Sequence, residues 1–295
     1  MLWFNLSIFA AAAKAANQGI TKTLTRDFSV LAIAAYGQLA AGILIFPLIF
    51  FPGTIDIPGN ISFHKAALVT VVINIIAIIL LVEAIRRSDL SYSLPLLGLT
   101  PVFTIFMGWM LRGEVISLSG VLGILLVFFG ALDIDTKSFR DWAKLGGKRI
   151  FRDTGVRLVV MVACMYSVSS VYDKTATLLS DPATFVWYSA IIRSVILMII
   201  FSCRCRPRNG ATAKPSLSLL HLFLFALLGA TFLAEALSQM CAMQTGLVAY
   251  VIAIKRLSIL ITTLLGMIVY KEGFSRARLS GAALIVAGAG IIYLS

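Results

Sequence analysis

Lys255 and Arg256 are adjacent cations inside the apolar stretch 246–270. The stretch is long enough to cross a lipid bilayer, and the pair lies near its middle. A charge at that depth costs about 2.5–3.5 kcal/mol on insertion scales, so such charges are rare and usually functional. Because the two like charges also repel each other, we expect an anionic group to meet them in the folded protein. The pair is therefore a candidate binding site for an anionic substrate.

A second group of polar side chains lies in the first apolar segment, residues 2–20. Asn17 and Gln18 follow Lys14 at the i+3 and i+4 positions, so a helix would present all three on one face. A lysine can instead snorkel to the membrane interface, but Lys14 is too central in the segment for that. We expect these three residues to line a cavity and contact substrate.

The second half of the chain adds further candidates within its apolar segments. Arg193 can reach a substrate or form a structural ion pair. The segment 156–179 carries polar side chains on one helical face, at Tyr166, Ser169, Ser170 and Asp173. Ser169 is a candidate for the cavity wall, although serine also packs helix on helix. Asp173 and the adjacent Lys174 are expected at the membrane interface.

Glu235 and Gln239 share one helical face and form a candidate group for charge pairing or coupling. We expect Glu235 to pair with a cation of the apolar segments, because a buried acid near cations stays ionised. The candidate partners are Lys255, Arg256 and Arg193. The alternative is that Glu235 carries protons. Tyr92 and Tyr250 occupy corresponding positions of the two halves and are candidates for lining the cavity, with simple packing as the alternative.

The composition shows which elements must position these side chains. The chain has 295 residues, of which 60% are hydrophobic and only 13% charged, and its mean hydropathy is +0.97. Soluble domains carry about 25% charged residues. The net charge of +12 comes from basic residues clustered in short loops, a pattern that sets membrane topology and gives no reason to expect a nucleic-acid partner. We predict a multi-pass membrane protein whose partners are the lipid bilayer and a small-molecule substrate.

The predicted fold is all-α, with ten transmembrane helices arranged as two inverted five-helix repeats. Boundaries of 1–136 and 154–295 are predicted for the repeats, joined by a connecting loop at 137–153. Pro95 and Pro101 should kink the fourth span and free backbone carbonyls near its centre. The predicted spans are 2–20, 29–51, 63–85, 91–111, 115–132, 156–179, 183–203, 217–242, 247–270 and 277–294.

The repeat is visible in the sequence itself. A shift of 158 positions without gaps superimposes Tyr92 on Tyr250, Thr104 on Thr262, Gly108 on Gly266, Glu114 on Glu272, Ser117 on Ser275, Gly123 on Gly281 and Gly130 on Gly288. Because five helices is an odd number, the second copy must be inverted in the membrane. Inverted repeats are typical of secondary transporters, whose substrate binds between them near the midplane. Glu114 and Glu272 are expected to cap the turns and helices that follow them.

Several classes of site have no support in the sequence. The four cysteines form no CxxC motif and the two histidines are isolated, so we expect no metal and no cofactor. The nucleotide-binding motif GxxxxGK[ST] and the hydrolase motifs HExxH and GxSxG are missing, which argues against an ATP-driven pump and against an enzyme. The basic loops follow the odd-numbered spans, so the positive-inside rule predicts both termini outside the cytoplasm.

The repeated pattern Gly–x5–Glu–x8–Gly–x6–Gly, from Gly108 to Gly130 and from Gly266 to Gly288, resembles the signature of EamA-type transporters in the drug/metabolite transporter superfamily. The resemblance covers essentially the whole chain. It implies ten helices and commonly both termini in the cytoplasm, against the charge rule. Lys255-Arg256 also resembles the ninth-helix Lys-Arg of plastid sugar-phosphate translocators, which implies that the pair binds an anionic group.

The leading functional prediction is a secondary transporter of a small organic anion, phosphorylated or carboxylated, working by alternating access. One alternative is a proton-coupled exporter of amino acids or amphipathic compounds. An alternative of another class is an intramembrane enzyme or lipid-handling protein. We expect the bacterial or archaeal inner membrane as its location, and a monomer or a homodimer.

Overall fold

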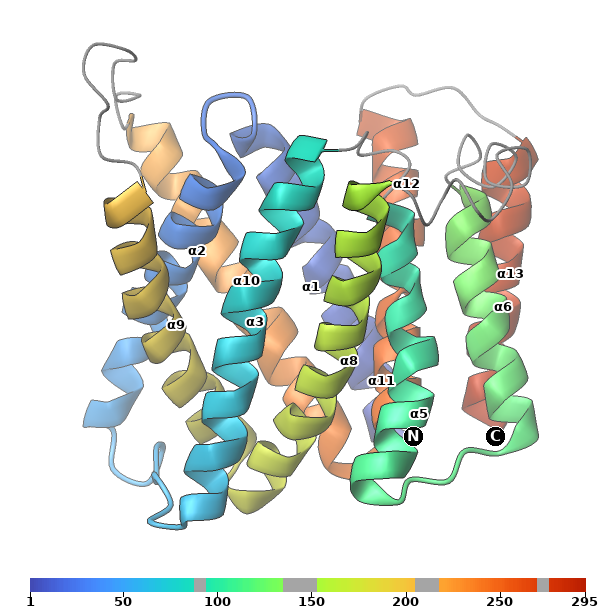
Figure 1. Ribbon diagram of the computed structural model, residues 1–295, viewed down its shortest axis with the longest axis horizontal. Coiled ribbons are helices and arrows are strands. Elements are labelled where there is room, and N and C mark those ends of the chain that lie inside the picture. Colours follow the sequence, from blue (N-terminus) through green and yellow to red (C-terminus); the bar gives the residue numbers. More distant parts are fainter. Residues whose placement is uncertain (88–93, 135–152, 205–217, 270–275) are drawn as a thin grey trace.

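The computed structural model describes residues 1–87, 94–134, 153–204, 218–269 and 276–295. These residues are almost entirely helical and contain no strand, which confirms the predicted all-α fold (Figure 1). The first half contains α1 (Leu2–Leu24), α2 (Val30–Ile45), η1 (Phe46–Phe50), α3 (Ile61–Arg87), η2 (Leu94–Leu99), α5 (Thr100–Arg112) and α6 (Leu118–Ile134). The second half contains α8 (Thr154–Leu179), α9 (Pro182–Arg204), α10 (Leu219–Thr245), α11 (Val248–Lys255), α12 (Leu257–Val269) and α13 (Arg276–Leu294).

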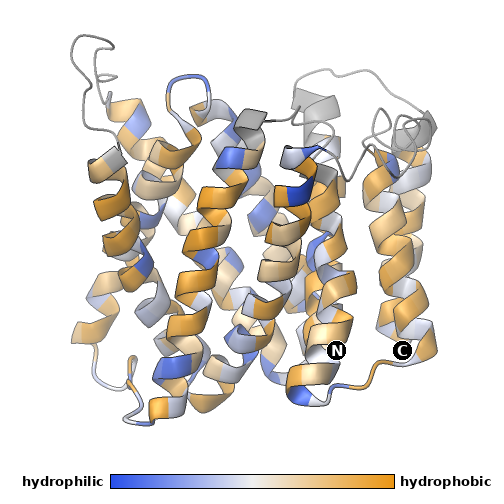
Figure 2. Ribbon diagram, in the orientation of Figure 1, coloured by the Kyte–Doolittle hydropathy of each residue, from blue (hydrophilic) through white to orange (hydrophobic). Residues whose placement is uncertain are grey.

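The helices consist mostly of apolar residues (Figure 2), and many large apolar side chains are exposed on them, as lipid requires. The described residues form ten helical segments when η1 is joined to α2, η2 to α5, and α11 to α12. Five segments are long and apolar enough to span a membrane without help: Val30–Phe50, Ile61–Leu81, Thr154–Leu179, Pro182–Cys203 and Leu219–Thr245. Three shorter apolar helices accompany them, Leu96–Arg112, Leu118–Ile134 and Leu279–Leu294. The chain is therefore a multi-pass membrane protein.

The helix contacts follow the pattern of two related repeats. Helix α3, the third of the first repeat, packs against α8, the first of the second repeat. The reciprocal pair, α1 and α10, is also in extensive contact. Corresponding helices meet as well, α2 with α9 and α6 with α13. Pairs that exchange in this way are expected when a pseudo-twofold axis relates the two halves.

Four glycines of the repeat signature form the crossing of α6 and α13. A Cβ atom added to Gly130 would lie 2.6 Å from the carbonyl oxygen of Gly281, and one added to Gly288 would lie 2.6 Å from that of Gly123. Because Gly123 meets Gly288 while Gly130 meets Gly281, the two helices run antiparallel. Small residues of this kind let membrane helices approach at backbone distance. The crossing therefore supports the predicted inversion of the second repeat.

The fourth and ninth segments are both interrupted at the same point of the repeat. In the ninth segment the α-helix stops at Lys255 and restarts at Leu257. In the fourth, the 3-10 helix η2 ends at Leu99 before α5 begins at Thr100. The 158-residue shift places Lys255 on Leu97, so the interruptions correspond. The prediction of one continuous span at 247–270 misses this break.

Both chain termini lie at the same end of the bundle, as ten crossings require (Figure 1). The α1–α2 connection, which carries Arg26 and follows Lys22 in the last turn of α1, lies at the opposite end. Which end faces the cytoplasm stays a prediction.

Candidate functional site

Glu235 of α10 lies at the centre of a charged cluster between the two repeats. One carboxylate oxygen, Oε1, is 2.9 Å from Lys255 Nζ of α11 and 3.4 Å from Lys14 Nζ of α1. Only 6% of the Glu235 side chain is exposed, against 21% for Lys255 and 35% for Lys14. The ammonium group of Lys255 also donates to Gln239 Oε1, one turn along α10. The structure therefore brings together Lys14, Glu235, Gln239 and Lys255.

The position of Lys255 follows from the helix break. As the last residue of α11, it projects where the carbonyl groups of a helix end are exposed and the helix dipole is negative. Residues Val248 to Ile254 of the same short helix are all buried. An interrupted helix of this kind is tolerated at membrane depth only where protein or a hydrated cavity surrounds it. The break thus allows a cation to be held inside the bundle.

Arg256 has a partner that the sequence analysis did not name. Its Nη2 donates to the carbonyl oxygen of Leu97 at 2.8 Å. In a regular helix this carbonyl would accept from the residue four positions later, but that residue is Pro101, which has no N–H. The hydroxyl of Thr100 also donates to it, at 2.7 Å. Arg256 therefore compensates for the interruption in the other repeat, and the expected freeing of a carbonyl by Pro101 agrees with this geometry.

Arg193 lies on the next helix, α9, and belongs to the same charged region. Its Nε donates to the backbone oxygen of Ser189 at 3.1 Å, and its guanidinium carbon lies 5.2 Å from the ring centre of Phe232. It interacts electrostatically with Glu235 and Asp173. The two acids and Arg193 are thus close enough to influence one another.

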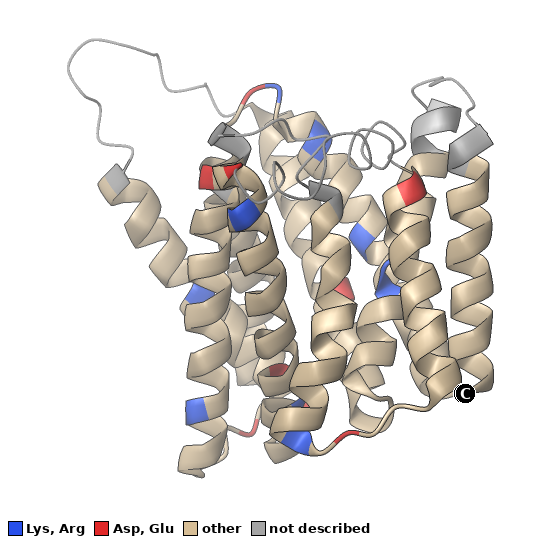
Figure 3. Cartoon of the chain, turned by 45° about the vertical axis from the view of Figure 1, so that its right-hand side comes forward, with Lys and Arg blue, Asp and Glu red and all other residues tan. Residues whose placement is uncertain are grey.

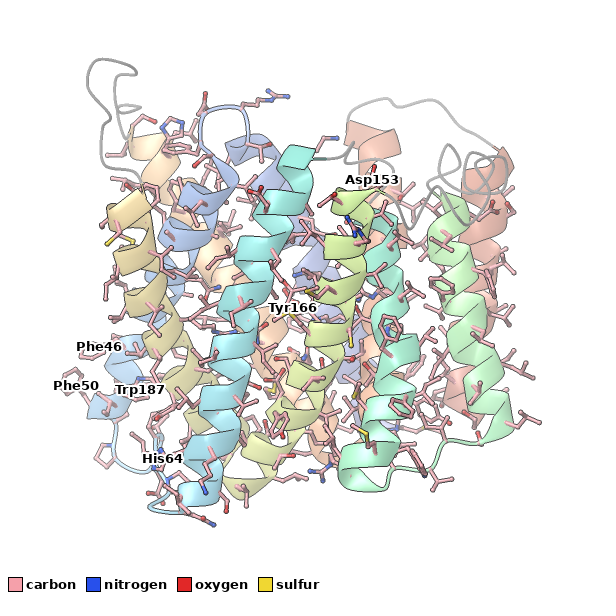
Figure 4. All side chains as sticks on the ribbon, viewed as in Figure 1. Phe46, Phe50, His64, Asp153, Tyr166 and Trp187 are labelled. Atoms are coloured by element: carbon pink, nitrogen blue, oxygen red, sulfur yellow. The ribbon has the colours of Figure 1, made fainter. Side chains whose placement is uncertain are left out.

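Tyr166 and Asp173, on one face of α8, complete the region. Tyr166 lies midway along α8 (Figure 4) and interacts electrostatically with Arg256, Glu235 and Arg193. Asp173 is 9% exposed and interacts with Arg193 and Lys255. Asp173 is buried among the helices, and its predicted place at the membrane interface stays a prediction. Its i, i+7 spacing from Tyr166 places both on the inner face.

Three further candidate residues form hydrogen bonds between helices. Asn17 Nδ2 donates to the Leu228 backbone oxygen at 3.1 Å, and Gln18 Oε1 accepts from the Thr262 hydroxyl at 3.0 Å. Ser169, 2% exposed, accepts a hydrogen bond from the Asn74 side chain at 2.7 Å. These contacts link α1 to α10 and α12, and α8 to α3.

Tyr250 packs against residues of other segments of the chain. Its ring stacks on Trp3 at 6.1 Å between centroids, and its hydroxyl lies 3.2 Å from that of Ser117 in the α5–α6 connection. The geometry does not include Tyr250 in the charged cluster. Its repeat mate, Tyr92, lies outside the described residues.

Glu114 caps a helix, but not the one that follows it. Its Oε2 accepts from the backbone N–H of Val248, the first residue of α11, at 3.0 Å. Its Oε1 pairs with Lys174 Nζ of α8 at 2.7 Å. Lys174 also donates to the Gly246 carbonyl at 2.9 Å. The prediction of a local cap was therefore wrong, because the carboxylate reaches across to the other repeat.

Charged residues are sparse along the described helices (Figure 3). No group of three His, Cys, Asp or Glu side chains that could hold a metal ion occurs in the part of the chain that the structure describes. Two five-helix repeats related by inversion, with charged residues between them, are an arrangement found in membrane transporters.

The sequence model of the EamA-like transporter family matches residues 1–134 and 153–294. The chain therefore belongs to the EamA-like transporter family, part of the drug/metabolite transporter superfamily, and is a membrane transporter of small solutes. A solved crystal structure of a protein is similar with a TM-score of 0.76 and 14% sequence identity, over 99% of this chain and 96% of that chain. At that identity the likeness shows the fold alone. The comparison with curated proteins gave no significant match.

Proposed function

We propose that this protein is a secondary transporter of a small organic anion, a phosphorylated or carboxylated metabolite, and that it works by alternating access. The observation that carries the proposal is the charge balance in the centre of the bundle. Four cations, Lys14, Arg193, Lys255 and Arg256, surround only two acids, Glu235 and Asp173, among the described residues of this region. An anionic guest would reduce the excess of two positive charges.

The two lysines of the cluster are the residues that a guest can reach. Their side chains keep 21% and 35% of their surface exposed, although Glu235 between them is almost completely buried. An ammonium group has three N–H donors, and Lys255 uses two of them for Glu235 and Gln239 of α10. Its third N–H can therefore donate to a bound anion. Lys255 and Lys14 are therefore the primary substrate ligands in this proposal. Arg256 supplies additional positive charge beside them.

Alternating access is supported by the symmetry of the helix breaks. Secondary transporters with inverted repeats commonly bind substrate at interrupted helices near the midplane, where one repeat moves against the other. Here both interruptions occur at corresponding positions, and the side chain of Arg256 joins them through Leu97. A bacterial or archaeal inner membrane, and a monomer or homodimer, stay predictions.

Uptake of labelled anions into proteoliposomes tests the proposal. A panel of phosphorylated and carboxylated metabolites should be taken up by the wild-type protein, and Lys255→Met should lower the rate about tenfold or more, because a buried charge contact with the guest is lost. Lys65→Met is the matched control, since Lys65 is an exposed lysine near the start of α3, and it should transport at the wild-type rate. Undiminished anion uptake by Lys255→Met would remove the proposed role.

A second candidate is a proton-coupled exporter of amino acids or amphipathic compounds. It is favoured by the central position of Glu235, whose Oε2 has no hydrogen-bond partner among the described residues. In that case Lys255 would hold a substrate carboxylate or merely pair with Glu235. Counterflow with the same panel plus amino acids, measured at two pH values and with a pH gradient across the membrane, separates the candidates, because only the exporter should respond strongly to the gradient.

A further inference from the structure

We infer that Glu235 is a built-in counter-ion that takes the place of the substrate anion at Lys255 and Lys14 in the empty transporter, and so allows the carrier to reorient without cargo. The inference rests on the proposed anion transport and deepens it. It assigns this protein net transport, in which the carrier returns empty, in addition to exchange of one anion for another.

The geometry places Glu235 where a substrate anion would act. Its Oε1 lies within 3.4 Å of both ammonium groups, one from each repeat. Its second oxygen, Oε2, is buried and has no hydrogen-bond partner among the described residues. A carboxylate with a role in stability alone would be expected to use both oxygens, because an unpaired buried acceptor is costly. One oxygen serving two lysines is the arrangement of a replaceable ligand.

Arg193 and Arg256 do not depend on Glu235 in the same way. Arg193 is held by the backbone oxygen and hydroxyl of Ser189, and Arg256 by the carbonyl of Leu97. Lys14 forms an ion pair with Glu235. Lys255 donates hydrogen bonds to Glu235 and to the neutral amide of Gln239. The counter-charge of Glu235 is therefore directed at the two lysines.

A carrier that alternates must pass through a state in which the site is closed to water on both sides. An unpaired charge in such a site at membrane depth is strongly disfavoured. With substrate bound, the anion supplies the counter-charge. Without substrate, Glu235 can supply it, because it bridges the lysines of both repeats. A protein without this carboxylate should therefore move only when an anion is bound, and should carry out exchange in preference to net transport.

The test compares two modes of transport with labelled inorganic phosphate as the probe. Net uptake is measured into proteoliposomes without internal phosphate, and exchange into proteoliposomes preloaded with unlabelled phosphate. For Glu235→Gln the ratio of net uptake to exchange should fall about tenfold or more relative to wild type. Exchange that is still measurable shows that the variant is folded.

A rescue variant makes the test independent of the folding of Glu235→Gln. The double variant Glu235→Gln/Gln239→Glu moves the acid one turn along α10, to a side chain that already accepts from Lys255. It should recover the ratio to near the wild-type value. A purely structural role of Glu235 predicts no such recovery.

Three results would overturn the inference. They are an unchanged ratio in Glu235→Gln, equal loss of both modes, and a double variant that fails to recover the ratio. A wild-type protein that exchanges neither phosphate nor any anion of the metabolite panel would instead count against the proposed anion transport, and the inference would fall with it.

Discussion

At the scale of single residues, the ion-pair network around Glu114 joins three separate segments of the chain. The carboxylate, on a side chain only 8% exposed, binds Lys174 of α8, the N-terminus of α11, and at 3.6 Å the guanidinium of Arg112. Lys174 extends the network by donating a hydrogen bond to the carbonyl oxygen of Gly246. Removing one member of a buried ion pair leaves its partner uncompensated, which is more costly than losing an exposed pair.

We expect Glu114→Gln to lower the free energy of unfolding in detergent by about 3 kcal/mol, because Lys174 would keep its charge without a counter-ion. The amide could still accept from Val248, so the loss reports mainly on the ion pair. Chemical denaturation followed by circular dichroism measures it. Asp56→Asn, at an exposed acid, is the control and should change stability by no more than about 0.5 kcal/mol. Equal stability of Glu114→Gln and wild type would show that the ion-pair network contributes nothing to the free energy of unfolding.

A pairing of Glu235 with a cation of the apolar spans could be predicted, because each charge there needs a partner. Which of the candidate cations pairs with it could not, and the structure shows Lys255 together with Lys14. The partner of Arg256 could not be predicted, since a backbone carbonyl has no signature in the sequence. Only the combination of Pro101 with the corresponding position in the other repeat points to Leu97. For Asn17, Gln18 and Ser169, polarity in a membrane span predicts a binding role. The structure shows these side chains in hydrogen bonds between helices, and their role in binding stays a prediction.

At the scale of helices, α6 and α13 cross at a distance that only glycine permits. The carbonyl of Gly130 lies 2.6 Å from the position that a Cβ of residue 281 would occupy. Backbone cannot move aside as a side chain can, so any substitution there separates the helices. Gly290 lies on α13 as well, and a Cβ atom added to it would meet no atom within 4 Å.

These two glycines form a matched pair for a test of the crossing. Gly281→Ala should lower the free energy of unfolding by about 1–3 kcal/mol through overpacking. Gly290→Ala should be neutral or slightly stabilising, because alanine favours a helix. Thermal unfolding of both variants in one detergent measures the difference. If the two variants unfold at the same temperature, the close approach of α6 and α13 does not stabilise the fold.

Most helices could be predicted because apolar runs of membrane length leave few alternatives. The break between α11 and α12 could not, since no proline or glycine occurs within 247–265 to mark it. Its repeat mate in the fourth segment is marked by Pro95 and Pro101, and the correspondence of the halves is the one indication that the ninth segment is interrupted too. The connecting loop predicted at 137–153 lies, except for Asp153, outside the described residues.

At the scale of the whole molecule, the account depends on two repeats that enclose a region with more cations than acids. The inversion of the repeats could be predicted from an odd number of helices per copy, and the antiparallel glycine crossing agrees with it. The charge balance could be predicted only in part. Asp173 joins the region as a second acid and reduces the excess, yet the cations still outnumber the acids by two.

Ligand-dependent thermal unfolding of the purified protein tests the central claim most directly. A solute that binds only the folded state stabilises it by RT ln(1 + [L]/Kd), so the midpoint temperature rises as the solute concentration increases above its Kd. Anionic metabolites should raise the midpoint of the wild-type protein and have little effect on Lys255→Met, while neutral and cationic solutes should leave both unchanged. Stabilisation by cationic or neutral solutes alone, or an equal shift by anions in Lys255→Met, would contradict an anion site at Lys255.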